Sequence, residues 1–383
     1  MKFIGLVLKS ARRSKRRTAL TMLSVAIAVF LFSALRAVLD GFDAVSAASS
    51  STRIITINAT SMIFNMPTGY LETIRNTPGV KDVTYANWFG GIYKDPKNFF
   101  GNFGVDAEAY FRIYPEIILT PDQKKAFLED RTGCIVGDGL ASTYGWKLGD
   151  KITLQVGIPI YGSRDYDFTV RGIYKAGSSA VDNQSMMFHW KYLDERAIEH
   201  GIGWFVAQVN DPDKAVQVAQ AIDQKFANSP AETKTDTERA FSAQFGKMLG
   251  NLDLLLGSVA LAVVITTLFV AGNTMAMSVR ERTTEIAVMR TLGFSKPVVF
   301  LIVVGEGLVT ALIGGALGAA IARLTINGEF LHMTGGFIPA FGVSNWNAAV
   351  GLGLSALIGI LAAVIPATMA TRLKIVDALR RVA

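Results

Sequence analysis

The residues best suited to metal chemistry lie between positions 189 and 200. His189 and His200 flank Glu195 and Glu199, and imidazole and carboxylate groups both bind zinc. The spacing His-Glu-x-x-His, which places two imidazoles on one helical face, does not occur in the sequence. This pattern therefore favours a solvated helix face over a metal site.

Nucleophilic and phosphate chemistry have little support in the sequence. Cys134 is the only cysteine, so an intramolecular disulfide is excluded, and a Cys134 nucleophile would need a base from elsewhere in the fold. The sequence contains no Gly-x-Ser-x-Gly elbow and no Gly-x-x-x-x-Gly-Lys-Ser/Thr phosphate loop. The glycines between Gly133 and Leu154 are therefore interpreted as turn residues. We expect no enzyme activity and no cofactor in this chain.

Four long apolar runs dominate the 383 residues, half of which are hydrophobic. A helix needs about 20 apolar residues to cross a hydrocarbon core. A cleaved signal peptide usually has a shorter apolar core of about 7–15 residues, so we interpret the first run as an uncleaved span. Pro366 is expected to kink or end the last span. The predicted spans are residues 18–40, 251–278, 298–322 and 348–370.

The net charge of +7 is concentrated beside these spans. Residues 1–17, 278–297 and 371–383 together carry 15 Lys/Arg and 3 Asp/Glu, whereas residues 41–250 carry 21 and 24. The positive-inside rule then places both termini and the loop 279–297 in the cytoplasm. Residues 1–17 are predicted to form an amphipathic helix on anionic lipid. Because the large polar region is slightly acidic, nucleic-acid binding is excluded.

Residues 41–250 are predicted to form a mixed α+β extracytoplasmic domain, and residues 323–347 an outer loop. Thr120 followed by Pro121 indicates a helix running toward Arg131. Asp211-Pro212 indicates a second helix with Ala215, Val218, Ala219, Ile222 and Phe226 facing inward. The predicted strands are Arg53–Asn58, Lys151–Tyr161, the segment in which Tyr166, Phe168 and Val170 alternate with polar residues, and Trp204–Val209.

Three residues of the third span could do more than cross lipid. Glu306 is the only acidic residue in the interior of the spans, since Asp40 and Asp253 lie at span ends, and an intramembrane carboxylate usually faces protein or water. A proton relay would need a second ionisable group, which the span interiors do not supply. Gly314 and Gly318, four residues apart, predict a close helix–helix contact, with a lipid-facing run of small residues as the alternative.

The loop between the second and third spans carries four cations and two acids. Ile286, Met289 and Leu292 recur at helical spacing, so we predict a short amphipathic helix at the membrane surface, ended by Gly293. A basic hinge between two spans would explain the same composition. The charged residues are Arg280, Glu281, Arg282, Glu285, Arg290 and Lys296.

The segment Arg280–Gly293, Arg-Glu-Arg-x-x-Glu-Ile-x-x-x-Arg-x-Leu-Gly, resembles the cytoplasmic coupling loop of FtsX-like, or MacB-like, permeases of ABC transporters, the superfamily of macrolide-exporting and lipoprotein-releasing systems. Further segments resemble the same family in its own order, with departures at Ser24, Val25 and Ile375. The family often has glutamate at the position of Glu306, which favours packing or coupling over proton transport. These further segments are Arg16–Leu23, Thr77–Val83, Gly133–Leu154 and Pro366–Arg380.

The resemblance implies a fold and a set of site residues. The fold is an α-helical membrane protein with four spans and an α+β domain inserted between the first two. Glu306, Gly314, Gly318 and Pro366 would serve intramembrane packing or coupling. The residues implied in coupling to an ATPase are Arg280, Glu281, Arg282, Glu285, Ile286, Met289, Arg290 and Gly293.

The resemblance also implies a function in the bacterial inner membrane. The chain would be a permease subunit, working as a homo- or heterodimer among membrane lipids with two copies of a separate ATPase that binds ATP and magnesium. ATP-driven motion would be transmitted to the extracytoplasmic domain to export or release a small molecule, peptide or lipoprotein, with a periplasmic adaptor in efflux systems. In the alternative, the chain signals to an extracytoplasmic enzyme such as a cell-wall hydrolase and transports nothing. The size of the inserted domain favours the exporter, and the neighbouring gene would discriminate between the two.

Overall fold

A computed structural model describes residues 15–98, 100–178, 181–248, 252–326 and 342–372. These residues divide into two compact units. The helical unit contains residues 15–39, 252–326 and 342–372, and the sheet unit contains the described residues from 40 to 248. Most of the predicted amphipathic helix at 1–17, most of the outer loop at 323–347 and most of the tail at 371–383 lie outside the described residues.

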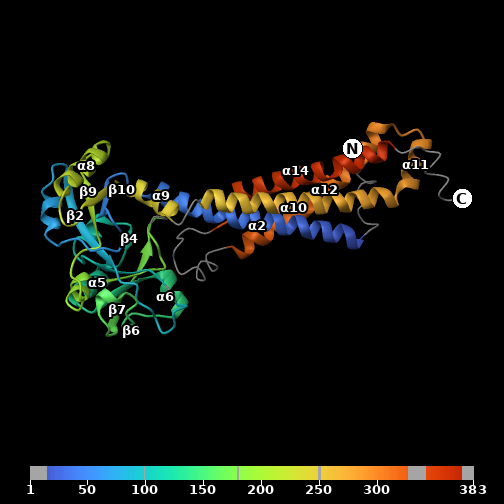
Figure 1. Ribbon diagram of the computed structural model, residues 1–383. Coiled ribbons are helices and arrows are strands. Elements are labelled where there is room, and N and C mark those ends of the chain that lie inside the picture. The colour runs from blue at the N-terminus through green and yellow to red at the C-terminus, as the bar shows by residue number, and fades with distance from the viewer. Residues whose placement is uncertain (1–14, 99, 179–180, 249–251, 327–341, 373–383) are drawn as a thin grey trace. The chain divides into compact units, whose positions relative to one another are not determined.

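Four long helices form the helical unit together with one short helix, α11 (Thr283–Thr291) (Figure 1). Each long helix contains a window whose mean hydropathy is 2.2–2.5 and is long enough to cross a membrane. The shortest, with 27 residues, is about 40 Å long at 1.5 Å per residue. The helices are α2 (Lys15–Ala48), whose last turns belong to the sheet unit, α10 (Leu252–Glu281), α12 (Lys296–Thr325) and α14 (Asn345–Thr371). Helix α14 continues through Pro366, which is buried, so the chain does not end its last span there.

Small residues bring α12 close to two neighbouring helices. A methyl group placed on Gly314 would lie 2.5 Å from the carbonyl oxygen of Met22 on α2. A methyl group placed on Gly318 would lie 2.2 Å from the carbonyl oxygen of Ala26, also on α2. On another face of α12, the carbonyl oxygen of Gly359 on α14 lies 2.8 Å from the corresponding position on Gly307. Because helices without Cβ atoms at their contacts can approach closely in lipid, these glycines determine the packing of three spans.

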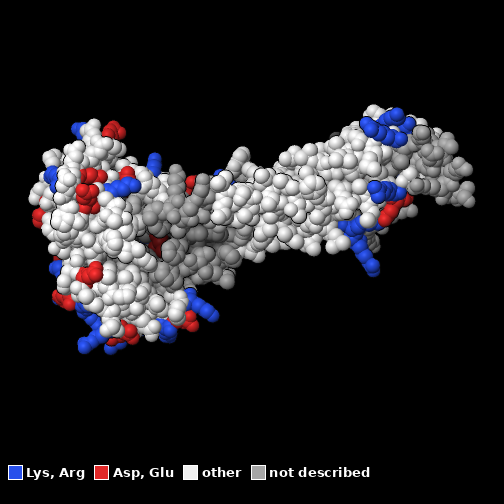
Figure 2. Space-filling view, in the orientation of Figure 1, with Lys and Arg blue, Asp and Glu red and all other residues white. Residues whose placement is uncertain are grey.

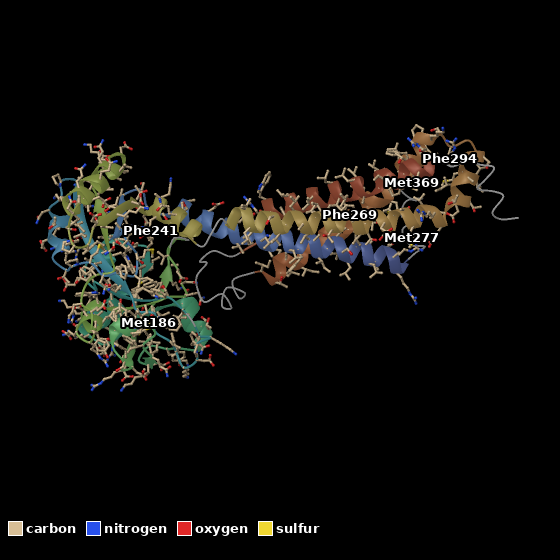
Figure 3. The ribbon with its side chains drawn as sticks, viewed as in Figure 1. Met186, Phe241, Phe269, Met277, Phe294 and Met369 are labelled. Atoms are coloured by element: carbon tan, nitrogen blue, oxygen red, sulfur yellow. The ribbon has the colours of Figure 1, made fainter. Side chains whose placement is uncertain are left out.

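The outer surface of the long helices is apolar. On α10, Phe269 is 72% exposed and Met277 is also exposed, and both are labelled in Figure 3. On the face shown in Figure 2, lysine, arginine and acidic atoms in the helical unit gather near α11, while the helix flanks are almost free of charge. This distribution is that of helices solvated by lipid along their length and by water at the α11 end.

The sheet unit is built on a ten-stranded mixed sheet in the order β10-β1-β9-β2-β3-β8-β5-β7-β4, with β6 paired to β7. The pairs β3–β8 and β5–β7 are parallel and the others antiparallel. The strands are β1 (Arg53–Asn58), β2 (Val80–Trp88), β3 (Asn102–Val105), β4 (Ile117–Ile118), β5 (Gly133–Gly137), β6 (Lys151–Leu154), β7 (Tyr166–Ala176), β8 (Met186–His189), β9 (Trp204–Val209) and β10 (Thr233–Thr237).

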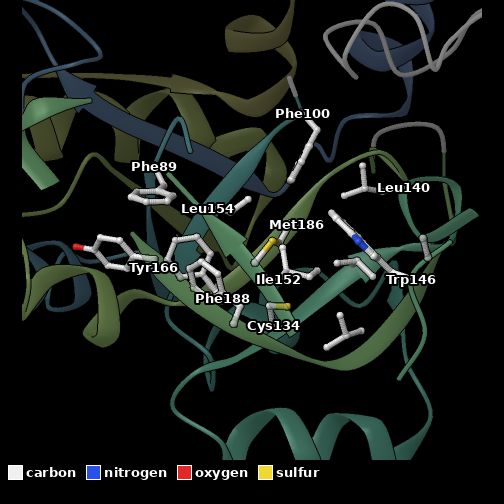
Figure 4. Close-up of a cluster of buried hydrophobic side chains, with 14 of the residues drawn as sticks. Phe89, Phe100, Cys134, Leu140, Trp146, Ile152, Leu154, Tyr166, Met186 and Phe188 are labelled. Carbon is white, nitrogen blue, oxygen red and sulfur yellow. The ribbon is translucent and has the colours of Figure 1, made fainter. Parts of the chain in front are cut away.

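Helices cover the two halves of this sheet and enclose separate cores. Helices α3 and α8 pack on β1, β2, β9 and β10, and α5, α6 and α7 pack on the other half. Phe89, Tyr166, Phe188 and Trp146 are among the aromatic side chains of the core shown in Figure 4. The helices are α3 (Tyr70–Arg75), α4 (Tyr110–Ile113), α5 (Pro121–Glu129), α6 (Asp138–Tyr144), α7 (Trp190–Asp194), α8 (Ala215–Phe226) and α9 (Glu238–Met248), with single 3-10 turns η1 (Pro159–Tyr161) and η2 (Pro212–Lys214).

Most local predictions for this unit are confirmed. Strands β1 and β9 have the expected limits, and the Thr120 side chain accepts a hydrogen bond from the Gln123 amide at the start of α5. All five residues expected to face inward from α8 are buried. The strand expected over Lys151–Tyr161 was wrong in its second half, because Pro159 begins the turn η1 and β6 ends at Leu154.

Candidate functional site

Helix α11 occupies most of the loop between α10 and α12, as the periodicity predicts. It follows a one-residue break at Arg282 and ends at Thr291. Gly293 then adopts φ +93°, a conformation that residues with side chains rarely take. The Gly293 and Phe294 amides bond the carbonyl oxygens of Arg290 and Met289, which caps the helix end. The chain therefore reverses sharply between α11 and α12.

The inner face of α11 packs on three spans. Ile286 is buried and Met289 lies against the same cluster, together with Phe294, which Figure 3 labels near Met369. The cluster draws on α10, α12 and α14 through Met275, Val279, Val299, Val303, Ala363, Ala367 and Ala370. Because three spans share one apolar core with α11, a displacement of this helix disturbs all of them.

The outer face of α11 is exposed. Val288 is 43% exposed and Leu292, just past the helix end, is 73% exposed. Helical spacing predicts Leu292 on the same face as Ile286 and Met289, but in the structure Leu292 is separated from them. The signal for this second face was the four-residue spacing of Val288 and Leu292, which places them on one side of the chain.

Glu306 pairs with Arg282, which begins the turn into α11. Arg282 Nη1 donates to Glu306 Oε2 at 2.7 Å, and its Nε lies 3.3 Å from Glu285 Oε2. Glu306 is only 6% exposed, whereas Glu285 is largely accessible. The sequence analysis sought a partner for Glu306 among the spans, but the partner comes from the loop.

A small cavity lies beneath this ion pair. Its volume is about 20 Å³, which is room for about one water molecule. Arg282, Glu306 and Ser278 supply its polar lining, and the rest is apolar, from Met275, Val279, Ile286, Met289, Val299, Ile302 and Val303.

A second ion pair joins the same corner to α2. Arg17 donates to Glu281 Oε2 on the last residue of α10. Successive residues, Glu281 and Arg282, thus contact α2 and α12. No short-range sequence pattern connects residues so far apart, which is why the sequence analysis missed both pairs.

The other predicted site residues lie apart from this corner or on its surface. Arg280 is exposed and Arg290 half-buried, on either side of the α10–α11 turn. Gly314 and Gly318 lie further along α12 against α2, as described above. Pro366 is buried on α14.

The candidate residues for metal or nucleophilic chemistry have separate environments in the sheet unit. His189 Nε2 lies 2.7 Å from the Phe127 carbonyl oxygen, and burial lowers the pKa of its imidazole. His200 lies beside Asp194, and Glu195 pairs with Arg131. Cys134 is fully buried, and burial raises the pKa of its thiol well above its usual range. These groups do not converge on one point.

The four apolar helices and the domain inserted after the first of them define a membrane protein with a large extracytoplasmic domain. Residues 18–225 match the family described as MacB-like periplasmic core domain, and residues 257–375 match the FtsX-like permease C-terminal family. The chain belongs to the MacB-like family and is an ABC transporter permease of the MacB/FtsX type.

Individual relatives agree with this assignment. An uncharacterised ABC transporter permease of Methanocaldococcus jannaschii is 24% identical over 338 residues, which cover 83% of this chain and 82% of the relative. The macrolide export ATP-binding/permease protein MacB of a Shewanella species is 34% identical over 147 residues, which cover 38% of this chain but only 22% of that protein.

Solved structures of related domains are similar only at low identity. The periplasmic region of MacB from Actinobacillus actinomycetemcomitans is 9% identical with a TM-score of 0.37, covering 54% of this chain and 95% of that one. The extracellular domain of the transporter YknZ from Gram-positive bacteria is 12% identical with a TM-score of 0.36, covering 48% of this chain and 99% of that one.

Proposed function

We propose that this permease transmits the motion of a separate ATPase to its extracytoplasmic domain and thereby drives export or release of a substrate. Helix α11 is the docking element for the ATPase. The observation that carries this proposal is the two-faced character of α11, which packs on three spans through Ile286 and Met289 and presents Val288 and Leu292 outward.

The outer face of α11 has the composition of a small docking surface. Val288 and Leu292 are apolar and exposed, and Glu285, one helical turn before Val288, carries charge and is 39% exposed. A central apolar contact with a polar rim is the usual anatomy of a protein interface. Support for an ATPase as the occupant comes from the Shewanella relative, whose name joins an ATP-binding part to a permease.

The ion pairs supply the route from α11 into the spans. A displacement of α11 would pull on α12 through Arg282 and Glu306, and the neighbouring Glu281 would pull on α2 through Arg17. Rigid helices joined by discrete contacts switch between packed arrangements instead of deforming smoothly. The motion would thus reach the span that leads into the extracytoplasmic domain.

ATP and magnesium would be bound by the partner, since the sequence has no phosphate-binding loop. Four spans per chain and two ATPases imply a dimer of permeases in the inner membrane, with both termini inside. A periplasmic adaptor would complete an efflux system. The size of the inserted domain favours export, but docking on the outer face of α11 would serve a regulated extracytoplasmic enzyme as well, so the assay must score transport and ATP hydrolysis separately.

The test is a charge and polarity scan of the outer face of α11. Glu285→Arg, Arg290→Glu and Leu292→Asp should weaken co-purification of the ATPase and lower permease-dependent ATP hydrolysis at least tenfold, since losing a central contact costs about 2 kcal/mol or more. Glu72→Arg, a reversal on the exposed helix α3 of the sheet unit, is the matched control.

Folding is monitored by thermal unfolding in detergent, with Glu285→Gln to separate loss of the Arg282 contact from reversal of charge. Unchanged complex formation and hydrolysis in all three α11 variants would overturn the docking role and leave a solvated hinge.

A further inference from the structure

Arg53, the first residue of β1, is a buried cation at the base of the sheet unit. Its side chain is 3% exposed. Its Nε donates to Glu238 Oε2 at 2.8 Å, and its Nη1 donates to Glu116 Oε1 at 2.9 Å and to the Ile113 carbonyl oxygen at 3.0 Å. The guanidinium also lies 4.5 Å from the centre of the Tyr114 ring. One side chain thus joins β1, α9 and the segment that follows α4.

The electrostatics of this cluster indicate a fixed geometry. Burial acts to lower the pKa of Arg53, but its carboxylate partners Glu238 and Glu116 outweigh that effect and hold the pKa above its ordinary value. Burial likewise raises the pKa of Tyr114, so its ring stays neutral under the cation. A buried ion pair adds little net stability, because desolvating the charges offsets their attraction. Its strict hydrogen-bond geometry can instead specify how the joined segments are arranged.

The joined segments are those through which the chain enters and leaves the sheet unit. Strand β1 is the first strand after α2, and α9 follows β10, the last strand, which pairs antiparallel with β1 from Ile54 opposite Thr237. The end of α2 therefore lies beside the start of α9.

Polar contacts extend this junction beyond Arg53. The Ser50 amide donates to Glu238 Oε2 at 2.8 Å, the same oxygen that Arg53 binds. The hydroxyl oxygen of Ser49, the residue that follows α2, lies 3.1 Å from that of Ser242, one turn beyond Glu238 on α9. The Ser46 hydroxyl donates to the Arg239 carbonyl oxygen at 3.4 Å.

We propose that Arg53 is a positioning residue that locks the last turns of α2 to α9, so that these turns, α9 and the sheet move as one body. Removing the guanidinium frees α9 to slide along α2 while both halves of the sheet keep their cores. The consequence for transport rests on the proposed function: motion of the first span enters the extracytoplasmic domain as a single rigid displacement.

The first experiment measures this lock without any transport assay. Ser49→Cys and Ser242→Cys are introduced into the full chain in detergent, and disulfide formation is followed after addition of copper phenanthroline. The buried, high-pKa Cys134 should not compete. We expect Arg53→Met to slow cross-linking at least fivefold, whereas Arg112→Met, which breaks an exposed ion pair with Asp82 in the same unit, should not.

A second variant guards against misfolding of Arg53→Met. The double variant Arg53→Met/Glu238→Gln removes both buried charges. The side-chain amide oxygen that it introduces at position 238 can still accept a hydrogen bond from the Ser50 backbone N–H. An unchanged cross-linking rate in both Arg53 variants would overturn the proposal.

The second experiment uses the complex with its ATPase. In the otherwise unaltered chain, the disulfide between positions 49 and 242 should leave the coupling of the ATPase to the permease unchanged. In Arg53→Met, the same disulfide should restore the coupling that the substitution removes, and a reductant should reverse this rescue. Loss of coupling on cross-linking the otherwise unaltered chain would show that the helices slide, against the proposal. Absence of any coupling in the unaltered chain would instead count against the proposed function, and the cross-linking rates would still test the lock.

Discussion

Arg282 and Glu306 form a 2.7 Å ion pair between the turn that precedes α11 and the first half of α12. The carboxylate is almost completely buried, while the guanidinium retains some contact with water. Removing one partner of a buried pair leaves an uncompensated charge, which is usually more costly than never having placed the pair. The relationship between these two residues is therefore better tested by removing both together than by removing either alone.

We expect Arg282→Met and Glu306→Met each to lower the stability of the helical unit by about 1–3 kcal/mol, less than for a fully buried pair because Arg282 is partly exposed. The double variant should recover most of that loss. Reversible unfolding in mixed micelles measures both quantities, and Glu285→Gln provides the control for a weaker contact of the same arginine. Additive losses in the double variant would show that the two residues do not act as a pair.

The contact between α12 and α2 leads to a prediction about glycine. A methyl group on Gly318 would lie 2.2 Å from the Ala26 carbonyl oxygen, which is backbone and cannot rotate away. Gly318→Ala should therefore force the helices apart and cost about 1–3 kcal/mol. Gly353→Ala on α14 is the matched control, because nothing lies within 4 Å of its added methyl group.

Alanine also has the higher helix propensity, so the control should be neutral or slightly stabilising. Thermal unfolding in detergent compares the two variants, and equal melting temperatures would indicate that this face of α12 meets lipid.

Asp182 gives a prediction for the pH dependence of the sheet unit. Burial raises the pKa of its carboxyl to about 6 from an ordinary value of 3.8. The folded protein thus holds the proton to a higher pH than the unfolded chain does, and the free energy of unfolding falls as the pH rises through this window. Asp182→Asn should stabilise the protein above pH 6 by about 1–2 kcal/mol, after allowance for partial exposure.

The gain from Asp182→Asn should shrink steadily as the pH falls toward 4, because the carboxyl then becomes protonated in both states. The side-chain amide oxygen introduced at position 182 can still accept a hydrogen bond from the Gln184 backbone N–H, as Asp182 Oδ1 does in the unaltered protein. Thermal melts across pH 4–7 measure the effect, with Asp165→Asn on the exposed surface as the control. A stability difference that does not change with pH would contradict the assignment of this carboxyl.

Much of the architecture was predictable because its signals are local. The apolar runs predicted the four long helices. Thr120 and Pro121 predicted the N-terminus of α5, and Gly293 predicted the end of α11. Strand β6 shows the limit of such signals, since an apolar run beyond Leu154 became a turn at Pro159.

The candidate site was only half predictable. The helical spacing of Ile286 and Met289 indicated the inner face of α11. The pairing of Arg282 with Glu306, and of Arg53 with Glu238, depends on tertiary contacts between residues 24 and 185 positions apart. No periodicity links such positions, so only the folded arrangement reveals them.

The topology can be tested with two serines that are both exposed in the structure. Ser163 lies in the sheet unit and Ser295 lies just before α12, beside α11. The excess of Lys and Arg around α11 predicts that Ser295 is cytoplasmic and Ser163 extracytoplasmic.

Single cysteines at these positions, in a Cys134→Ser background, are treated with an impermeant thiol reagent in intact spheroplasts. We expect labelling at position 163 at once and at position 295 only after permeabilisation, because the reagent cannot cross the membrane. Labelling at 295 but not at 163 in intact cells would invert the topology and place α11 on the wrong side of the membrane to meet an ATPase.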